Sequence, residues 1–535
     1  MRAGPGSERC AIVTMSNTKT IAKNTGWYGL ETVISSLVTI ISSIAIARAL
    51  GPTKTGFIIY ISYVASVVGN FGGFGIPAAT RKYMAEFIGG GDKGTARYIF
   101  SHTFRMQVAL ASVATAGILF WVLRDTNNQY HLASALIVLS IWPSMVNSIP
   151  AGANAASEDL AANAPASVVS AFVYLFAIAA TVLFHWGVTG IGAALLLMRS
   201  VDFLVRLFPT MRHMRTWERG HSLPDGVRKR MISFAWQSIA TMLLAMIVWE
   251  RFEVLLLKSL CADIRQVAYY SIAFSMGNTL LLSASIFAGA AGTTIYAQYG
   301  RDKSRLPQLT AASFRYLVIS TMPLHAVATA LAFPALIFFY GGKYSDAAAV
   351  VTIAPLLCMP KAFVSPIQGL LESTEHQAYE IATMIVAGLV DVGVTWSLVA
   401  SHGAVGACIG SGAAQITAVA IMWTIGIRLY RVKLPWVLTA KVAFLSAVAA
   451  YCAHLFTARL RPLPGILAGG AAAAIVIAAL FYALRVLEPE DHKRFAILTK
   501  MLPQPASGLC DRLLTLLIRP RPDGKIETEE MDARV

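Results

Sequence analysis

Charged residues are scarce in this sequence. Only 13% of its 535 residues are Asp, Glu, Lys or Arg, whereas 56% are hydrophobic. A soluble domain has about 25% charged residues, because its surface must face water. A chain of this composition cannot cover its own surface with polar groups, which excludes an ordinary soluble enzyme and indicates that much of the surface faces lipid. Since a bilayer-spanning helix needs about 20 mostly apolar residues, there is room for about a dozen spans or more.

Patterned cysteines and nucleotide-binding loops are also missing. The cysteines form no CxxC pair and no group with metal-ligand spacing, which argues against a metal site or a disulfide framework. No GxxxxGK[ST] sequence occurs, so the chain is not itself an ATPase. No Ser/His/Asp arrangement stands out, and we expect neither enzymatic activity nor a cofactor. The cysteines are best interpreted as small apolar helix residues: Cys10, Cys261, Cys358, Cys408, Cys452 and Cys510.

The N-terminus lacks a cleavable signal peptide. Residues 1–23 contain no apolar run of adequate length. Met15 begins the run MSNTKTIAKNTGW, which resembles a more natural start. We therefore expect residues 1–14 to be a disordered leader or a misassigned start.

Apolar windows dominate the rest of the chain. They are too long and too continuous for barrel strands of about ten alternating residues, so they predict helices. The fold class expected is an all-α polytopic membrane protein with about 14 transmembrane helices, in two six-helix pseudo-symmetric lobes plus two C-terminal helices. The windows lie near 25–47, 57–78, 98–123, 131–155, 164–185, 188–210, 231–257, 267–296, 314–340, 347–371, 378–400, 404–427, 437–457 and 464–486.

Basic residues between these windows predict the orientation. If the N-terminus is cytoplasmic, the cytoplasmic segments carry about fourfold more Lys and Arg than the outer loops. This bias favours an even number of spans with both termini in the cytoplasm. It also explains the net charge of +16 without nucleic-acid binding. Two predicted cytoplasmic loops, 156–163 and 372–377, depart from the pattern because they are acidic.

The longest connection between windows divides the chain into lobes. Residues 211–230 are basic and separate six windows from eight. Each half continues after its first hairpin with a similar run of small and aromatic residues, TGFIIYISY and VAYYSIAFS. This similarity supports an internal repeat of the kind found in transporters. The tail is expected to be largely disordered, with one interfacial helix over 508–519. The expected domains are 1–24 (cytoplasmic), 25–210 (N-lobe), 211–230 (linker), 231–427 (C-lobe), 428–486 (last two spans) and 487–535 (cytoplasmic tail).

Ionisable residues inside the windows mark candidate functional positions, since charge at bilayer depth is costly and normally faces a cavity or a partner. Arg199, Asp202 and Arg206 are spaced i, i+3, i+7 and share one helix face. They could line a cavity. Alternatively, Asp202 forms a structural pair with an arginine while Arg206 extends to the cytoplasmic interface.

The seventh window carries the sequence WERFE. On a continuous helix Glu250 and Glu253 share a face in the outer third of the membrane. Either carboxylate could bind a proton or a cation, or could simply pair with Arg251.

Single charges occur in other windows. Glu31, Arg105, Lys361 and Asp391 lie within spans, where such residues normally line a wet cavity. His325 is interpreted as a buried, hydrogen-bonded histidine rather than a ligand.

Both lobes thus contribute basic groups that could form a cavity with positive walls. Guanidinium groups bind phosphate through two parallel hydrogen bonds, so such a cavity suits an anionic substrate. The candidate substrate-binding residues are Arg105, Arg199, Arg206, Arg251 and Lys361. The candidate groups for coupling to H⁺ or Na⁺ are Glu31, Asp202, Glu250, Glu253 and Asp391.

Two motifs near the N-terminus resemble a known family. The run KNTGWYGLETVISSLVTIISSIAIARALGPTKTGFIIY and the following GFGIPAATRKYMAE resemble the first hairpin and the next element of the polysaccharide-biosynthesis (Wzx-type) flippases. That family shares a superfamily with MATE exporters and the lipid II flippase. The matching positions are Ala47, Arg48, Leu50, Gly51, Pro52, Gly56, Gly75, Thr80, Arg81, Tyr83, Ala85 and Glu86.

The resemblance implies a flippase. Members of the family move polyprenyl-pyrophosphate-linked oligosaccharides from the cytoplasmic to the outer leaflet, by alternating access through a cationic central cavity. The implied partners are that glycolipid, membrane lipids and the polymerase or export machinery of the same pathway. The chain is expected to act as a monomer. Arg48 and Arg81 match motif positions at span ends, where they could serve orientation.

Two other functions remain open. A MATE-like exporter of cationic compounds would need an acidic interior in its N-lobe, whereas the arginines there outnumber the carboxylates. A membrane polymerase or ligase of the same pathway would need a catalytic site on a long outer loop. The longest outer connection has only about ten residues.

Overall fold

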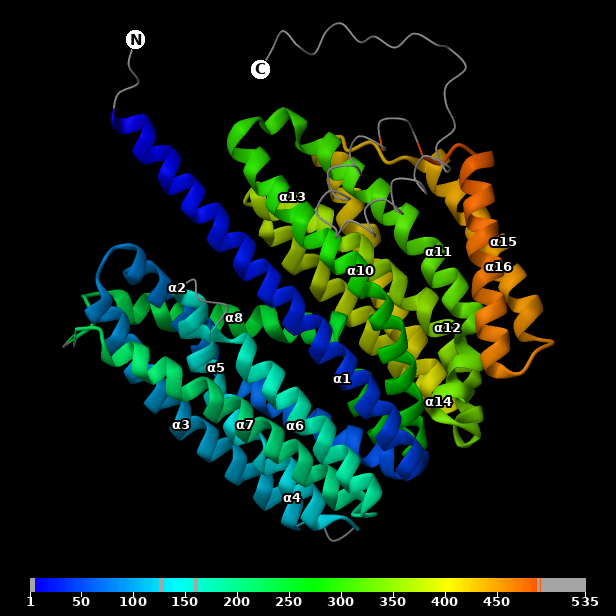
Figure 1. Cartoon of the computed structure of the whole chain (residues 1–535), viewed down its shortest axis with the longest axis horizontal. Coiled ribbons are helices and arrows are strands. Elements are labelled where there is room, and N and C mark those ends of the chain that lie inside the picture. The colour runs from blue at the N-terminus through cyan, green and yellow to red at the C-terminus, as the bar shows by residue number, and fades with distance from the viewer. Residues whose placement is uncertain are drawn as a thin grey trace, which may run out of the picture. The chain divides into compact units, whose positions relative to one another are not determined.

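The structure is a computed structural model that describes residues 5–124, 129–157, 162–218, 220, 222–487 and 491. Within these residues it is helical and contains no strand, which confirms the all-α fold class (Figure 1). Each of the fourteen apolar windows lies on helix. The tail beyond residue 491, including the expected interfacial helix over 508–519, lies outside the described residues.

Eleven helical segments in the described part of the chain are long and apolar enough to cross a membrane. Two of them, Val33–Phe71 and Gln377–Tyr430, have 39 and 54 residues. At 1.5 Å per residue they would be about 58 Å and about 80 Å long, far more than the hydrocarbon thickness of about 30 Å. Each is divided by a glycine with non-helical dihedral angles, Gly51 and Gly403, so each supplies two spans.

The chain divides into two compact units. Unit 1 contains Met1–Ser271, Phe339–Tyr344 and Thr395–Ala407. Its helices are α1 (Pro5–Phe71), α2 (Ile76–Gly89), α3 (Lys93–Arg124), α4 (His131–Leu139), α5 (Ile141–Ala156), α6 (Ala164–Leu183), α7 (Gly187–Arg215), α8 (Val227–Trp249), α9 (Glu253–Leu260) and the first turns of α10 (Arg265–Arg301).

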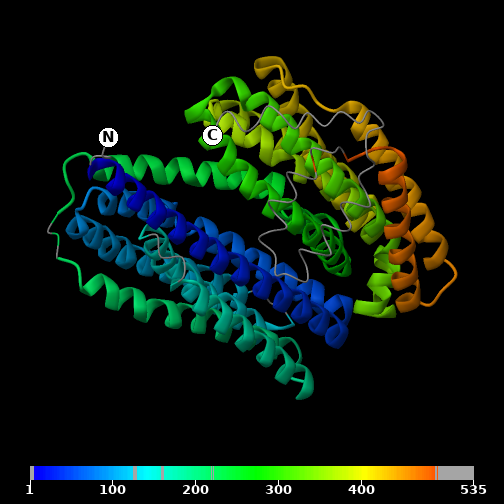
Figure 2. The same ribbon diagram turned by 45° about the horizontal axis from the view of Figure 1, so that its top comes forward.

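Unit 2 contains the remainder of the chain. Its helices are the rest of α10, α11 (Leu306–Tyr340) up to Phe338, α12 (Ala348–Cys358), α13 (Val364–Ser373), α14 (Gln377–Tyr430) except Thr395–Ala407, α15 (Trp436–Thr457) and α16 (Pro462–Ala483). Short 3-10 turns lie at η2 (Lys303–Arg305), η3 (Gly342–Ala347, shared with unit 1) and η4 (Met359–Phe363). The last two helices form a hairpin, the orange pair in Figures 1 and 2.

Two expectations about the N-terminal half were wrong. Of the two alternatives for residues 1–14, the disordered leader is contradicted, because the chain is helical from Pro5 onward as the start of α1, whereas the misassigned start stays a prediction. The seventh window is not one helix, because α8 ends at Trp249 and Glu250 has extended dihedral angles (φ −109°, ψ −165°) before α9 begins. Glu250 and Glu253 therefore do not share a helix face.

The boundary between the compact units differs from the expected boundary at 211–230. Unit 1 extends through α8 and α9 to Ser271. One reason is the close packing of α8 on the start of α2. A Cβ atom at Gly75 would lie 2.2 Å from the Ala235 carbonyl oxygen, so only glycine permits this approach. The two-lobe arrangement predicted from the sequence stays a prediction.

Two apolar cores hold unit 1 together. The larger one is built from α1, α3, α4, α5, α6 and α7, with fully buried residues such as Ile137, Val146 and Ile178. The second joins α2, α3, α5 and α8 through Met84, Ile99 and other residues. Between helices that cross a bilayer, such side chains stabilise the unit through close van der Waals packing, because lipid tails are as apolar as the core itself. These cores fix α1, α6, α7 and α8, the helices that carry the candidate site.

Candidate functional site

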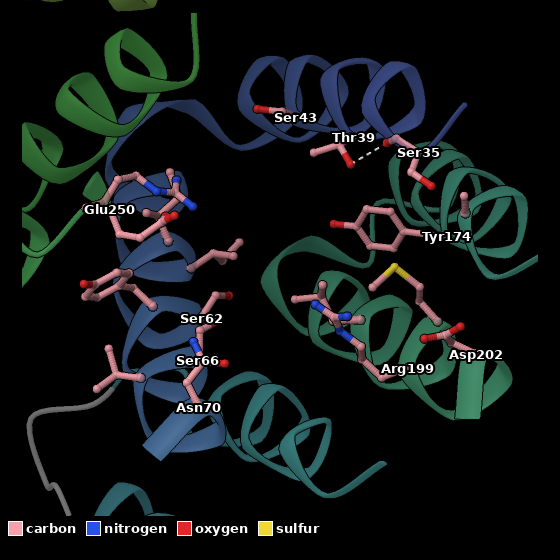
Figure 3. Close-up of a pocket in the computed structure, with 18 of the residues that line it drawn as sticks. Ser35, Thr39, Ser43, Ser62, Ser66, Asn70, Tyr174, Arg199, Asp202 and Glu250 are labelled. Atoms are coloured by element: carbon pink, nitrogen blue, oxygen red, sulfur yellow. Dashed lines mark hydrogen bonds between the residues drawn. The ribbon is translucent and has the colours of Figure 1, made fainter. Parts of the chain in front are cut away.

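A cavity of about 840 Å³ lies within unit 1. Its walls come from α1, α6, α7, the C-terminal part of α8 and the break that follows α8 (Figure 3). The volume falls in the range of about 300–1,000 Å³ that is typical of ligand pockets. A cavity formed by transmembrane helices is expected to hold a polar group that cannot stay in hydrocarbon.

Polar side chains follow both halves of α1 along this cavity. Ser35, Thr39 and Ser43 lie four residues apart before the Gly51 kink, and Ser62, Ser66 and Asn70 repeat the same spacing after it. Residues spaced by four share one face of a helix. The Thr39 hydroxyl donates to the Ser35 carbonyl at 2.7 Å, drawn as a dashed line in Figure 3. The buried Ser62 hydroxyl has no partner among the described residues.

Arg199 is the most available cation of the cavity wall. Its side chain is exposed and extends from α7 toward the open space in Figure 3. Among the described residues, no carboxylate lies within 4.0 Å of its guanidinium group. The Tyr174 side chain on α6 points into the same space and lies close enough to interact electrostatically with Arg199. A guanidinium group without an ion-pair partner can bind an anion.

Asp202 also lines the cavity, but both of its carboxylate oxygens are engaged. Oδ1 accepts a hydrogen bond from Arg206 Nη2 at 3.0 Å, and Oδ2 accepts one from Asn147 Nδ2 at 2.6 Å. Arg206 Nη2 also donates to the Ser167 hydroxyl at 2.9 Å. Arg206 is buried and is not a lining residue. In the structure Asp202 pairs with Arg206, and Arg206 is buried, which contradicts the alternative in which Arg206 extends to the interface while Asp202 has another arginine as its partner.

Glu250 and Arg251 line the cavity where α8 ends. The Glu250 carboxylate is exposed, and no basic group of the described residues lies within ion-pair distance of it. It lies on the opposite side of the cavity from Arg199 in Figure 3. The wall thus carries two arginines and two carboxylates, with Arg206 as a third cation behind Asp202. The wall of this cavity is therefore mixed in charge, and its predicted role as a cationic substrate site stays a prediction.

Three other predicted residues of unit 1 lie outside this cavity. Arg105 is exposed on α3, and its Nε donates to the Ser101 carbonyl at 3.2 Å. Glu31 is half-buried on α1 and is not among the lining residues. Glu253 is fully buried and accepts a hydrogen bond from the Tyr270 hydroxyl at 2.7 Å. Their roles in substrate binding or coupling stay predictions.

Three predicted residues belong to unit 2. Lys361 lies in η4 and donates to Asn278 Oδ1 at 3.5 Å. Asp391 is fully buried on α14. His325 is fully buried on α11, and its Nδ1 is 2.9 Å from the Thr321 carbonyl oxygen, which agrees with the interpretation as a buried, hydrogen-bonded histidine.

The first family-like motif forms the kink of α1. Gly51 adopts φ 75° and ψ 174°, a conformation that is essentially restricted to glycine, and Pro52 follows it. The Ala47 carbonyl at this kink accepts a hydrogen bond from the Tyr344 hydroxyl at 3.1 Å. A Cβ atom at Gly56 would lie 2.3 Å from the Ile264 carbonyl oxygen. These motif residues therefore have structural roles.

The charged motif residues lie on the surface of unit 1. Arg48 and Arg81 are exposed. Glu86 on α2 forms an ion pair with Arg230 on α8 at 3.1 Å. Exposed pairs of this kind contribute about 0–1 kcal/mol, so the pair orients α8 more than it stabilises the fold.

No metal centre is found in the described part of the chain, where no three His, Cys, Asp or Glu side chains are grouped so as to hold an ion.

The sequence analysis missed the hydroxyl stripes and Tyr174. The signal was present, since serine, threonine and asparagine recur every four residues within two otherwise apolar spans. Asn147 was also missed. Its bond to Asp202 joins residues 55 positions apart, which no local pattern indicates.

The fold, rather than the sequence, is similar to that of known proteins. No protein-family model matches the chain. No curated protein sequence matches it significantly. Solved structures do match: an inward-facing multidrug resistance MATE family transporter of the MOP superfamily has a TM-score of 0.63 at 15% identity, over 74% of this chain and 95% of that one.

Two further solved structures are similar. The lipid II flippase MurJ, in an inward closed conformation, has a TM-score of 0.65 at 13% identity, over 85% of this chain and 99% of that one. A MOP superfamily transporter from Pyrococcus furiosus, described as having a binding pocket of reverse polarity, has a TM-score of 0.55 at 14% identity, over 77% and 96%. At these identities the similarity shows the fold alone, and that fold is the one found in MATE transporters and in MurJ.

Proposed function

We propose that this chain is a flippase for a lipid-linked oligosaccharide that carries a diphosphate. The single observation behind this proposal is Arg199, a guanidinium group without an ion-pair partner among the described residues, on the wall of a hydroxyl-lined cavity. Guanidinium binds phosphate oxygens through two parallel, charge-assisted hydrogen bonds. A diphosphate and its sugars cannot enter hydrocarbon without such compensation.

The hydroxyl stripes of α1 suit the sugar part of this substrate. Ser62, Ser66 and Asn70 offer donors and acceptors on one face, and Tyr174 adds an aromatic ring with a hydroxyl. Hydroxyl and amide groups exchange hydrogen bonds readily with sugar hydroxyls. The cavity also contains apolar side chains such as Met242 and Trp249, which could pack against sugar rings or the start of the lipid tail.

The proposed cycle needs no covalent chemistry. The glycolipid enters from the cytoplasmic leaflet, Arg199 binds its diphosphate, and a conformational change exposes it to the outer leaflet while the polyprenyl tail stays in the bilayer. The MATE and MurJ fold supports this proposal, since both named neighbours are membrane transporters or flippases. Coupling to H⁺ or Na⁺ remains part of the proposal.

The test is a flipping assay with the purified chain in liposomes. A fluorescent polyprenyl-diphosphate oligosaccharide is placed in both leaflets, and a membrane-impermeant glycosidase reports the fraction that reaches the outside. We expect Arg199→Ala to slow flipping at least about tenfold, because it removes a charge-assisted contact. Arg199→Lys keeps the charge and should retain part of the rate. Wild-type flipping in the Arg199→Ala variant would contradict the proposal.

Glu250 supports a second candidate, a MATE-like exporter of cations. Its exposed carboxylate faces the cavity without an ion pair among the described residues, which is the arrangement that attracts a cation. Transport of a cationic dye in the same liposomes, lost in Glu250→Gln and kept in Arg199→Ala, would favour this function over the flippase.

A further inference from the structure

Arg199 has no ion-pair partner among the described residues, although a carboxylate lies three residues away on the same helix. Side chains at i and i+3 are neighbours on a helix surface, so an Arg199–Asp202 pair would be an ordinary local contact. No such contact forms in the structure. The cavity therefore keeps a free cation where its own sequence provides a neutralising partner.

The reason lies in the contacts of Asp202. One carboxylate oxygen accepts from Arg206 at 3.0 Å and the other from Asn147 at 2.6 Å. The side chains of Asp202 and Arg206 are only 14% and 9% exposed, so the pair is largely removed from water. Figure 3 shows Arg199 and Asp202 on the same helix, with Arg199 reaching into the cavity.

Arg206 itself cannot contact a ligand in this cavity in the described arrangement. It is buried, it does not line the cavity, and its Nη2 is held by Asp202 and by the Ser167 hydroxyl at 2.9 Å. Ser167 lies on α6, so the Arg206 side chain is fixed from two helices. Arg206 can therefore affect ligand binding through the lining groups that it contacts, the Asp202 carboxylate and the Ser167 hydroxyl.

We propose that Arg206 is a positioning residue that holds the Asp202 carboxylate, so that Arg199 stays free to bind a diphosphate. The inference rests on the proposed function. If Arg206 is removed, Asp202 becomes a half-buried carboxylate with Asn147 as its remaining described partner, and such a charge needs compensation. Arg199 is the cation nearest along the helix face, and pairing with it would occupy the anion-binding group.

The test measures binding of farnesyl diphosphate to the purified full-length chain in nanodiscs by titration calorimetry. We expect Arg206→Ala to weaken binding about tenfold, because Asp202 then competes for Arg199. The double variant Asp202→Asn/Arg206→Ala should bind as well as wild type or better, because the competing charge is gone. A purely structural role of Arg206 predicts no such rescue, since Asp202→Asn does not restore the lost side chain.

A matched control lies one turn further along α7. The Thr210 hydroxyl bonds to Asn154 Oδ1 at 3.0 Å and to the Arg206 carbonyl oxygen at 2.8 Å, so Thr210→Val removes buried hydrogen bonds next to Arg206 without changing charge. We expect its diphosphate affinity to equal that of wild type. Equal loss of affinity in Thr210→Val and Arg206→Ala would overturn the inference, and so would failure of the double variant to recover.

Two other outcomes separate the inference from the proposed function. If Arg206→Ala does not fold, the single variant Asp202→Asn tests the inference. The inference predicts that this variant binds farnesyl diphosphate more tightly than wild type, and a tenfold loss of affinity would contradict it. If wild type fails to bind farnesyl diphosphate, the anion site of the proposed function is wrong and the inference falls with it. If Arg206→Ala binds farnesyl diphosphate with wild-type affinity, the inference is overturned and the proposed function is not affected.

Discussion

Asp92 shows how one residue starts a long helix. It lies in the turn between α2 and α3, outside the spans, and its Oδ1 accepts a hydrogen bond from the Thr95 backbone N–H at 2.9 Å. This bond satisfies a donor that the first turn of α3 leaves open. Hydrogen bonds from the Thr95 side chain and backbone hold the pKa of the Asp92 carboxyl below its usual range.

We expect Asp92→Ala to destabilise the protein by about 1 kcal/mol at neutral pH, as for other helix caps. Because the folded pKa is lowered, this stabilisation is complete above the ordinary Asp pKa and is lost as the pH falls through the folded pKa. Thermal unfolding in detergent should therefore separate wild type from Asp92→Ala at pH 7, and the difference should disappear as the pH falls below the lowered pKa of Asp92.

Asp92→Asn is the control, since asparagine caps helices without titrating. Its stability should match wild type at pH 7. A difference between wild type and Asp92→Ala that persists unchanged at low pH would contradict the assigned role of the carboxylate.

Individual site residues were only partly predictable. The i, i+3, i+7 spacing identified Arg199, Asp202 and Arg206 as one face, and in the structure Asp202 pairs with Arg206, the arginine that was expected to extend to the interface if Asp202 formed a pair. The spacing could not decide which arginine pairs, because Ser167 and Asn147 come from other helices. Tertiary contacts of this kind select one local pair among those that helix geometry allows.

At the scale of single elements, the helices were predicted better than the breaks within them. Continuous apolar windows require helices, since each backbone polar group in a bilayer needs an internal partner. The break at Glu250 was missed because WERFE contains no glycine or proline to mark it. Its extended backbone places Glu250 and Arg251 at the cavity instead of on a helix face.

The kink of α1 depends on one glycine. Gly51 has φ 75° and ψ 174°, and the nearest heavy atom to an added Cβ would be Lys343 Cδ at 3.9 Å. Space is therefore available, and the obstacle to a side chain is backbone conformation alone. We expect Gly51→Ala to destabilise the protein by about 1–3 kcal/mol, the cost of a non-glycine residue in this region.

Gly393 provides the matched comparison. It lies in the helical part of α14, where an added Cβ would meet nothing within 4 Å. Gly393→Ala should be neutral or should stabilise by about 0.5–1 kcal/mol, because alanine favours helix. Thermal unfolding of the two variants in the same detergent measures the difference. Equal unfolding temperatures of Gly51→Ala and Gly393→Ala would show that the backbone conformation at position 51 does not require glycine.

At the scale of the whole molecule, the uneven distribution of basic residues predicts which ends of the spans face the cytoplasm. Lys229 and Lys433 are exposed at ends predicted to be cytoplasmic, whereas Lys343 and Arg459 are exposed at ends predicted to be outside. The cause is the cost of moving Lys and Arg across the membrane during insertion. The prediction covers both the orientation and the even number of spans between these positions.

Single cysteines at these four positions test the orientation in intact cells. The background needs its native cysteines replaced, and Cys358 and Cys408 are buried, so small apolar replacements should be tolerated there. A membrane-impermeant maleimide should label Lys343→Cys and Arg459→Cys, and should label Lys229→Cys and Lys433→Cys only after the cells are permeabilised. Labelling of Lys229→Cys in intact cells would contradict the predicted orientation. Labelling of Lys433→Cys but not Lys229→Cys would mean an odd number of spans lies between them.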